Sequence, residues 1–226
     1  MPSLIFDADD TLWENNVYFE RAFEDFVDFL AHSTMARGEV AAAFDEIARA
    51  NLKVWGYGSA SFARSLRQCY ERLCERHLRD DDLAHVMQLG ERIVREPIRL
   101  IDGVEATLAA LAGRHDLTLM TKGHPEEQRL KIDRSGLGRY FRHAAVVAEK
   151  DPDAYRALAD ELGLEPKRTW MVGNSPRSDV NAALAAGLNA VYVPHPNTWH
   201  FELQPLAEGP GRLLRLARFA DLTAHF

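Results

Sequence analysis

Cysteine is scarce in this sequence of 226 residues, which contains only Cys69 and Cys74. Their spacing fits neither a zinc-binding pair nor a redox-active dithiol, and free thiols are typical of a reducing compartment. A free cysteine usually behaves as a small buried hydrophobic residue. We therefore expect both cysteines to serve in packing.

Long apolar runs and clusters of positive charge are also absent. No stretch approaches the roughly 18 consecutive apolar residues that would span a bilayer, and the N-terminal residues lack the charged region of a secretory signal. The net charge is -7, and no dense group of Lys and Arg stands apart from acidic residues. We therefore expect a cytoplasmic protein, a monomer or a homodimer, that binds neither membranes nor nucleic acid.

The composition is otherwise that of an ordinary globular protein. Hydrophobic residues make up 46% of the sequence and charged residues 27%, which argues against a disordered or fibrous chain. At roughly 150 residues per domain, the length indicates one large domain or a core with a smaller satellite.

The order of the hydrophobic patterns predicts an α/β protein with an inserted helical segment. Residues 3–6 form a short apolar run that is typical of a buried parallel strand. Residues 17–95 follow the spacing of amphipathic helices and predict a block of about four helices, with a break at Gly56 and Gly58.

After Pro97, short apolar strands alternate with amphipathic helices. This alternation predicts a Rossmann-like, doubly wound parallel sheet with helices on both faces. Beyond Pro194 the sequence offers only one further amphipathic stretch, residues 211–219. The expected strands cover residues 117–121, 144–148, 169–172 and 189–193, and the expected helices cover residues 126–134, 153–162 and 179–186.

The helical block interrupts the sheet sequence after its first strand. We therefore expect an α/β core domain formed by residues 1–14 and 98–226, and a helical cap domain formed by residues 15–97. In open parallel sheets, ligands bind outside the carboxyl ends of the strands. An insertion directly after the first strand would lie over that edge.

Acidic residues follow the first expected strand directly. Asp7 and Asp9 stand where two carboxylates can face one bound group, and Asp10 adds a third acid within four residues. Such crowding favours a counter-charge, and magnesium prefers hard oxygen ligands of this kind. The alternative is an acidic turn that caps the following helix, since Asp is common in turns and at N-caps.

Polar residues also follow the next two expected strands. Thr121, Lys122 and Gly123 offer a hydroxyl and backbone N–H groups that can bind an oxyanion. Lys150 follows the third strand and can bring a positive charge to the same edge. The alternative for each residue is an ordinary exposed loop.

The fourth expected strand ends at Gly173, and Asn174 and Asp179 follow it. Asp179 is also a candidate for the N-cap of its helix. Each polar group has an ordinary explanation, but all of them lie at the carboxyl ends of successive expected strands. That coincidence argues for one shared site.

With these motifs in order, the sequence resembles the haloacid dehalogenase superfamily of hydrolases, in the phosphatase branch with a helical cap after the first strand. The resemblance covers nearly the whole chain. The family's first motif, Asp-Xaa-Asp-Xaa-Thr, matches Asp7, Asp9 and Thr11. Its strand-ending Thr or Ser matches Thr121, and its lysine matches Lys150.

The last family motif is Gly-Asp followed by four residues and a second Asp. Gly173 and Asp179 match it, but Asn174 stands in place of the first Asp. The resemblance implies that magnesium is bound by Asp7, the Asp9 backbone carbonyl and Asp179, with Asn174 as a further candidate ligand. Because Asn174 removes one negative charge, we expect weaker magnesium binding.

The resemblance also implies the chemistry of a phosphatase. Asp7 would be the nucleophile and form an aspartyl-phosphate, and Asp9 would act first as an acid and then as a base. The substrate would be a small phosphorylated metabolite, because a helical lid excludes water and bulky partners. The phosphate would be bound by Thr121, Lys122, Gly123 and Lys150.

Two alternatives remain open from the sequence. A 2-haloacid dehalogenase of the same superfamily would displace halide, but the resemblance implies that this branch lacks the second aspartate and the metal. The other alternative is a catalytically idle protein of the same fold that binds a phosphometabolite for regulation. Function has to be argued from the site, and the intact acidic and basic residues favour an enzyme.

Overall fold

The computed structural model describes residues 1–226 and divides the chain into two compact units. One unit consists of Met1–Asn16 and Ile98–Phe226, and the other of Val17–Pro97. The first unit contains all of the strands, and the second consists of helices. None of the helices is both long and apolar enough to cross a membrane.

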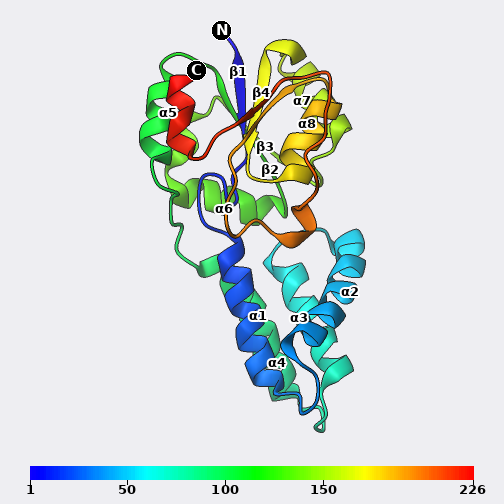
Figure 1. The fold of residues 1–226 in the computed structure, drawn as a ribbon. Helices are drawn as coiled ribbons and strands as arrows, with labels where there is room; N and C mark the ends of the chain where they lie inside the picture. The colour runs from blue at the N-terminus through cyan, green and yellow to red at the C-terminus, as the bar shows by residue number, and fades with distance from the viewer. The chain divides into compact units, whose positions relative to one another are not determined.

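The first unit is built on a parallel sheet of six strands in the order β3-β2-β1-β4-β5-β6 (Figure 1). This order places the first strand in the middle and runs outward in both directions, as in a doubly wound fold. The predicted Rossmann-like fold class is therefore confirmed. The strands are β1 (Ser3–Phe6), β2 (Leu117–Lys122), β3 (His143–Val147), β4 (Thr169–Gly173), β5 (Asn189–Tyr192) and β6 (Leu213–Arg215).

Alternate residues of β1 serve two separate cores, because successive side chains of a strand point to opposite faces. Leu4 and Phe6 pack on one face with the buried residues of α5 (Val104–Ala112) and η6 (Phe219–Ala224). Ile5 packs on the other face with Met120, Met171 and buried residues of α7 (Pro152–Glu161) and α8 (Ala182–Ala185). Figure 1 shows α5 and the C-terminal segment on one side of the sheet and α7 and α8 on the other.

The helices of this unit connect the strands and cover both faces. The segment 179–186, expected as one helix, forms a π-helical turn and then a short α-helix. The helical elements are α5 (Val104–Ala112), α6 (Pro125–Ser135), η2 (Leu137–Tyr140), α7 (Pro152–Glu161), η3 (Pro166–Arg168), η4 (Pro176–Asn181), α8 (Ala182–Ala185), η5 (His200–Glu202) and η6 (Phe219–Ala224).

The helical unit has a core of its own, rich in aromatic side chains. The Phe23 ring centroid lies 6.0 Å from that of Phe26 and 5.1 Å from that of Phe44, and Tyr70 is completely buried. Cys69 lies in the same core, and burial raises the pKa of its thiol to about 12. The elements are α1 (Asn16–Leu30), which begins at the last residue of the first unit's N-terminal segment, α2 (Arg37–Trp55), α3 (Ser59–Leu73), α4 (Asp80–Glu91) and η1 (Arg92–Arg95).

Candidate active site

Three of the residues singled out in the sequence meet at the carboxyl edge of the sheet. The Lys150 Nζ atom lies 2.5 Å from the Asp7 Oδ1 atom and 2.5 Å from the Asp179 Oδ1 atom. All three side chains are buried. They follow β3, β1 and β4, so the parallel sheet brings together residues that are far apart in the sequence.

This cluster contains one more carboxylate than ammonium groups. Burial opposes the charge of Lys150, but Asp179 and Asp7 outweigh that effect and raise the pKa of Lys150 well above its ordinary value. Burial and the charge of Asp7 raise the pKa of Asp179 to about 7, against the opposing effect of Lys150. The excess negative charge is thus poorly compensated by the protein alone, and a further cation would relieve it.

The turn after β4 is shaped to direct Asp179 toward this cluster. Gly173 is required because a Cβ atom there would lie 2.2 Å from the Asp179 Oδ2 atom. The Ser175 N–H donates to Asp179 Oδ2 at 2.8 Å, and the Ser175 hydroxyl accepts from the Ser178 N–H. Ser175, rather than Asp179, therefore occupies the N-cap position of η4.

Thr11 connects Asp7 to Asn174. The Thr11 hydroxyl lies 2.8 Å from Asp7 Oδ2 and 3.1 Å from Asn174 Oδ1, and it accepts the Asn174 N–H. The Asn174 Nδ2 atom donates to the Thr198 hydroxyl at 2.8 Å. The amide oxygen of Asn174 is therefore on the side of Asp7, where a metal ligand would have to lie.

The donor set of this edge fits a hard divalent cation. Asp7, Asp179 and Asn174 provide carboxylate and amide oxygens without a nitrogen or sulfur ligand, which is the chemistry that magnesium prefers. The excess carboxylate supports the same assignment. The residues present therefore fit the metal that the sequence motifs imply.

Asp9 faces a different set of residues. Its Oδ1 atom accepts from Trp13 Nε1 at 2.8 Å, and its Oδ2 atom from Gln128 Nε2 at 2.9 Å. Lys131 Nζ contacts both oxygens, at 3.1 and 2.9 Å. Burial would raise the pKa of Asp9, but Lys131, Gln128 and Trp13 outweigh it and lower that pKa.

The residues at the end of β2 lie in two environments. Thr121 is buried, whereas Lys122 is half-buried and its Nζ atom donates to Glu202 Oε1 at 2.5 Å and to the Ser178 hydroxyl at 2.8 Å. Gly123 has a φ of 145°, and a Cβ atom there would lie 2.8 Å from Gln128 Nε2. A glycine is needed here to admit the Gln128 side chain.

The ion pairs around Lys122 were not anticipated from the sequence. Glu202 also binds Arg177, at 3.0 Å, and the Ser175 hydroxyl. Arg177 in turn contacts Glu149 at 2.9 Å. Although burial opposes it, Lys122 and the neighbouring hydroxyl groups lower the pKa of Glu202 to about 2.

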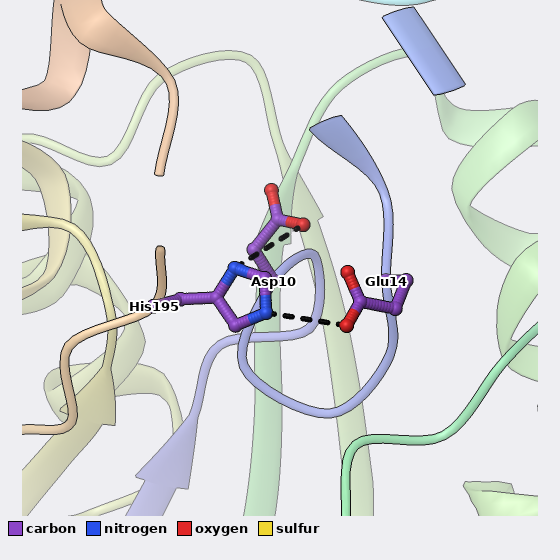
Figure 2. Close-up of side chains that lie close together, drawn as sticks. All are labelled: Asp10, Glu14 and His195. Atoms are coloured by element: carbon purple, nitrogen blue, oxygen red, sulfur yellow. Dashed lines mark hydrogen bonds and ion pairs between the residues drawn. The ribbon is translucent and has the colours of Figure 1, made fainter. Parts of the chain in front are cut away.

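A second group of ligand-type side chains lies beside the site. The Asp10, Glu14 and His195 side chains each place one oxygen or nitrogen atom within 4.8 Å of the others (Figure 2). The His195 Nε2 atom lies 3.4 Å from Glu14 Oε1, and its Nδ1 atom lies 3.9 Å from Asp10 Oδ1. Such a set can hold a metal ion, and the spacing of these three residues in the sequence does not indicate it.

Asp10 also has a structural role that explains its position. Its carboxylate accepts the N–H groups of Asn15 and Asn16, where α1 begins. Burial, together with the charges of Asp9 and Asp7, raises the pKa of Asp10 to about 8. Asp10, Thr11 and His195 line a pocket of about 390 Å³. The pocket lies between the loop that follows β1 and the residues that follow β5 and β6.

The chain is similar in sequence and fold to known hydrolases. A phosphoserine phosphatase from Thermus thermophilus is 34% identical over 114 residues, covering 47% of this chain and 46% of that protein. The chain thus spans about half the length of this curated relative. The structure of a haloacid dehalogenase-like hydrolase from Xanthomonas campestris has a TM-score of 0.84 and 29% identity, and covers 100% of this chain and 94% of that one.

A 2-haloacid dehalogenase from Pseudomonas syringae shares the fold. Its TM-score is 0.62 at 22% identity, with 99% of this chain and 97% of that chain covered. The family model of haloacid dehalogenase-like hydrolases matches residues 1–187. This span includes strands β1 to β4, whose carboxyl ends carry the candidate site, and the inserted helices. The chain therefore belongs to the haloacid dehalogenase-like hydrolases.

Proposed function

We propose that this protein is a magnesium-dependent phosphatase that hydrolyses a small phosphate monoester through an aspartyl-phosphate on Asp7, in the cytoplasm. The observation that carries the proposal is the buried cluster in which Lys150 Nζ contacts Asp7 and Asp179. The phosphatase among the relatives supports the reaction class. The two free cysteines support a reducing compartment.

In the first step, an Asp7 carboxylate oxygen attacks phosphorus, and the bond from phosphorus to the alcohol oxygen breaks. The proton of Asp9 passes to the leaving oxygen. In the second step, a water oxygen attacks phosphorus and Asp9 takes the proton of that water. The bond between phosphorus and Asp7 then breaks, and inorganic phosphate leaves.

Asp9 must carry a proton when the first step begins. Its lowered pKa favours the ionised form before substrate arrives. A phosphate dianion near Asp9 opposes that negative charge and raises the pKa of the carboxyl group. Proton uptake by Asp9 therefore accompanies substrate binding.

The remaining residues bind and orient the phosphoryl group. Lys150 offsets the negative charge that would otherwise keep a phosphate dianion away from the Asp7 carboxylate. Thr121, with the backbone N–H groups of Lys122 and Gly123, orients the phosphoryl oxygens. Asp7, the Asp9 carbonyl and Asp179, with Asn174 as a further candidate, would hold a magnesium ion, which would supply electrostatic stabilisation of the developing charge.

The helical unit, residues 17–97, would serve as the cap domain of this enzyme. A lid of this kind favours small phosphorylated metabolites over proteins or nucleic acids. The Lys122 side chain is engaged by Glu202 before substrate binds. Its proposed part in phosphate binding therefore lies with the backbone N–H, and its ammonium is available only if the pair with Glu202 opens.

The test is a hydrolysis screen over a panel of phosphomonoesters with and without Mg²⁺, with Asp7→Asn as the control. Metal-dependent release of phosphate that disappears in Asp7→Asn supports the proposal. Activity that survives in Asp7→Asn excludes the covalent mechanism. Binding of phosphorylated ligands without turnover would favour the regulatory alternative.

The dehalogenase alternative is tested by assaying the same proteins for the release of halide from 2-haloacids. The likeness to a dehalogenase structure concerns the fold alone. Displacement of halide needs no proton on the leaving group, so Asp9 would have no use in it. Release of halide from 2-haloacids, without phosphatase activity, would favour this alternative.

A further inference from the structure

Helix α6 presents two polar side chains, Gln128 and Lys131, to the catalytic edge, and neither belongs to the family motifs discussed above. Gln128 and Lys131 are both buried, at 4% and 7% exposure, although they lie on a helix that covers the sheet. They are three residues apart, so their side chains lie on the same face of α6. Both side chains end at the Asp9 carboxylate.

The bonds to Asp9 reach both of its carboxylate oxygens. Lys131 Nζ contacts both carboxylate oxygens, and the same ammonium contacts Asn15 Oδ1 at 2.8 Å. Gln128 and Trp13 each add one further donor. A carboxylate with donors on both oxygens is fixed in rotation as well as in position.

The position of Gln128 leaves one of its polar atoms unpaired. Its Nε2 atom donates to Asp9 and to the Lys122 carbonyl, but its Oε1 atom is buried and has no hydrogen-bond partner. A buried acceptor without a partner is destabilising. The approach of the side chain also requires Gly123, where a Cβ atom would collide with Gln128 Nε2.

We propose that Lys131 and Gln128 are positioning residues for Asp9, which hold its carboxyl group in the orientation needed for proton transfer to and from the leaving group. This inference rests on the proposed function, because it assigns Asp9 the acid–base role. Neither residue contacts the nucleophile. The effect of Lys131 passes through Asp9, whereas Gln128 also binds the Lys122 carbonyl.

The role has a specific kinetic consequence. An alkoxide is a poor leaving group and needs a proton as the phosphorus–oxygen bond breaks, whereas 4-nitrophenolate leaves without one. Loss of the Asp9 orientation should therefore slow hydrolysis of an alkyl phosphate much more than hydrolysis of 4-nitrophenyl phosphate. Asp7 and Lys150 serve both substrates, so a general disturbance of the site would slow both equally.

The experiment measures kcat and KM for an alkyl phosphate and for 4-nitrophenyl phosphate, with saturating Mg²⁺. For Lys131→Met we expect kcat to fall at least about 30-fold on the alkyl phosphate and less than about 3-fold on the aryl phosphate, since acid–base catalysis contributes about 10²- to 10⁴-fold. KM should change little. Lys131→Arg keeps the positive charge and should recover most of the loss.

Arg129→Met is the matched control, because it removes an exposed positive charge from the same helix. It should leave both substrates unaffected. In an Asp9→Asn background, Lys131→Met should cause no further selective loss, since the group that it orients can no longer transfer a proton. Gln128→Met removes one bond to Asp9 and should also lower kcat more for the alkyl phosphate than for the aryl phosphate, but by a smaller factor. This variant tests the inference even if Lys131→Met does not fold.

The outcomes separate this inference from the proposed function. The positioning role is overturned if the variants lose kcat equally on both substrates. It is also overturned if Asp9→Asn loses kcat selectively on the alkyl phosphate and Lys131→Met or Gln128→Met does not. Either result leaves the phosphatase assignment intact. A wild-type protein that hydrolyses neither substrate overturns both.

Discussion

Two buried lysines serve the same edge of the sheet with opposite charge balances. Lys150 lies between two carboxylates, Asp7 and Asp179. Lys131 pairs with one carboxylate, Asp9, and otherwise contacts an amide oxygen. The first cluster therefore keeps an excess of negative charge, and the second is neutral. A neutral cluster can hold a side chain in place, whereas a cluster with excess negative charge is suited to bind a cation.

The largest effect is expected from Asp7→Asn, which converts the first cluster into a neutral pair like the second. We expect the hydrolysis rate to fall by at least about 10⁴-fold, because the amide cannot act as the nucleophile. Magnesium binding should weaken as well. Steady-state rates and calorimetric titration measure the two effects, and thermal melting confirms that the variant is folded.

Lys150→Met should lower the hydrolysis rate by about 10³-fold, because it removes the charge that stabilises the phosphoryl group. Both Lys150→Met and Lys131→Met remove one partner of a buried ion pair, which costs about 3–5 kcal/mol. In Lys150→Met, however, Mg²⁺ can supply the missing positive charge. Thermal melting with and without Mg²⁺ should show recovery for Lys150→Met only. Equal recovery in both variants would contradict the proposed difference between the clusters.

Glu202 extends the comparison to the ion pairs around Lys122. Its pKa lies at about 2 in the folded protein, below the ordinary value of 4.5. A lowered pKa contributes stability above the unfolded value, and this contribution is lost as the pH falls from about 4.5 toward 2. We expect up to about 3 kcal/mol of such stability. In urea unfolding between these pH values, the free energy of unfolding should depend less on pH in Glu202→Gln than in the wild type. Identical pH dependences in the two proteins would refute the assignment.

Asn174→Asp should have the smallest effect, and it adds to the charge imbalance of the first cluster. We expect magnesium affinity to rise by about 10-fold, because affinity depends on the charge of the ligands. Gln88→Glu adds the same charge at an exposed position of the helical unit and should leave the affinity unchanged. An unchanged affinity in Asn174→Asp would show that position 174 does not sense the metal.

The sequence predicted the fold class and family because their signals are local. Asp7 and Gly173 lie at the ends of buried strands, where short apolar runs are easy to recognise. Helix α5 and strand β6 were missed, and the expected amphipathic stretch 211–219 contains β6 and the first residue of η6. Helix α5 is apolar over almost all of its length and lacks an amphipathic period, and β6 has only three residues. Neither produces the periodicity on which such predictions depend.

The partners of Asp9 and of Lys122 could not be predicted for a different reason. Gln128 and Lys131 are 119 and 122 residues away from Asp9 in the sequence, and Glu202 is 80 residues away from Lys122. Polar residues on a helix are normally exposed, so their type alone indicates a solvated face. Only the packing of α6 against the loop that follows β1 distinguishes Gln128 and Lys131 from the exposed residues of the same helix.

The covalent intermediate on Asp7 is the central claim, and trapping tests it most directly. The protein is mixed with excess substrate and Mg²⁺, quenched during turnover and reduced with borohydride, which converts an aspartyl-phosphate to homoserine. Peptide mass spectrometry should find homoserine at position 7 and unmodified aspartate at position 9. Rapid hydrolysis with unmodified aspartate at position 7 and modification at another residue would contradict the account.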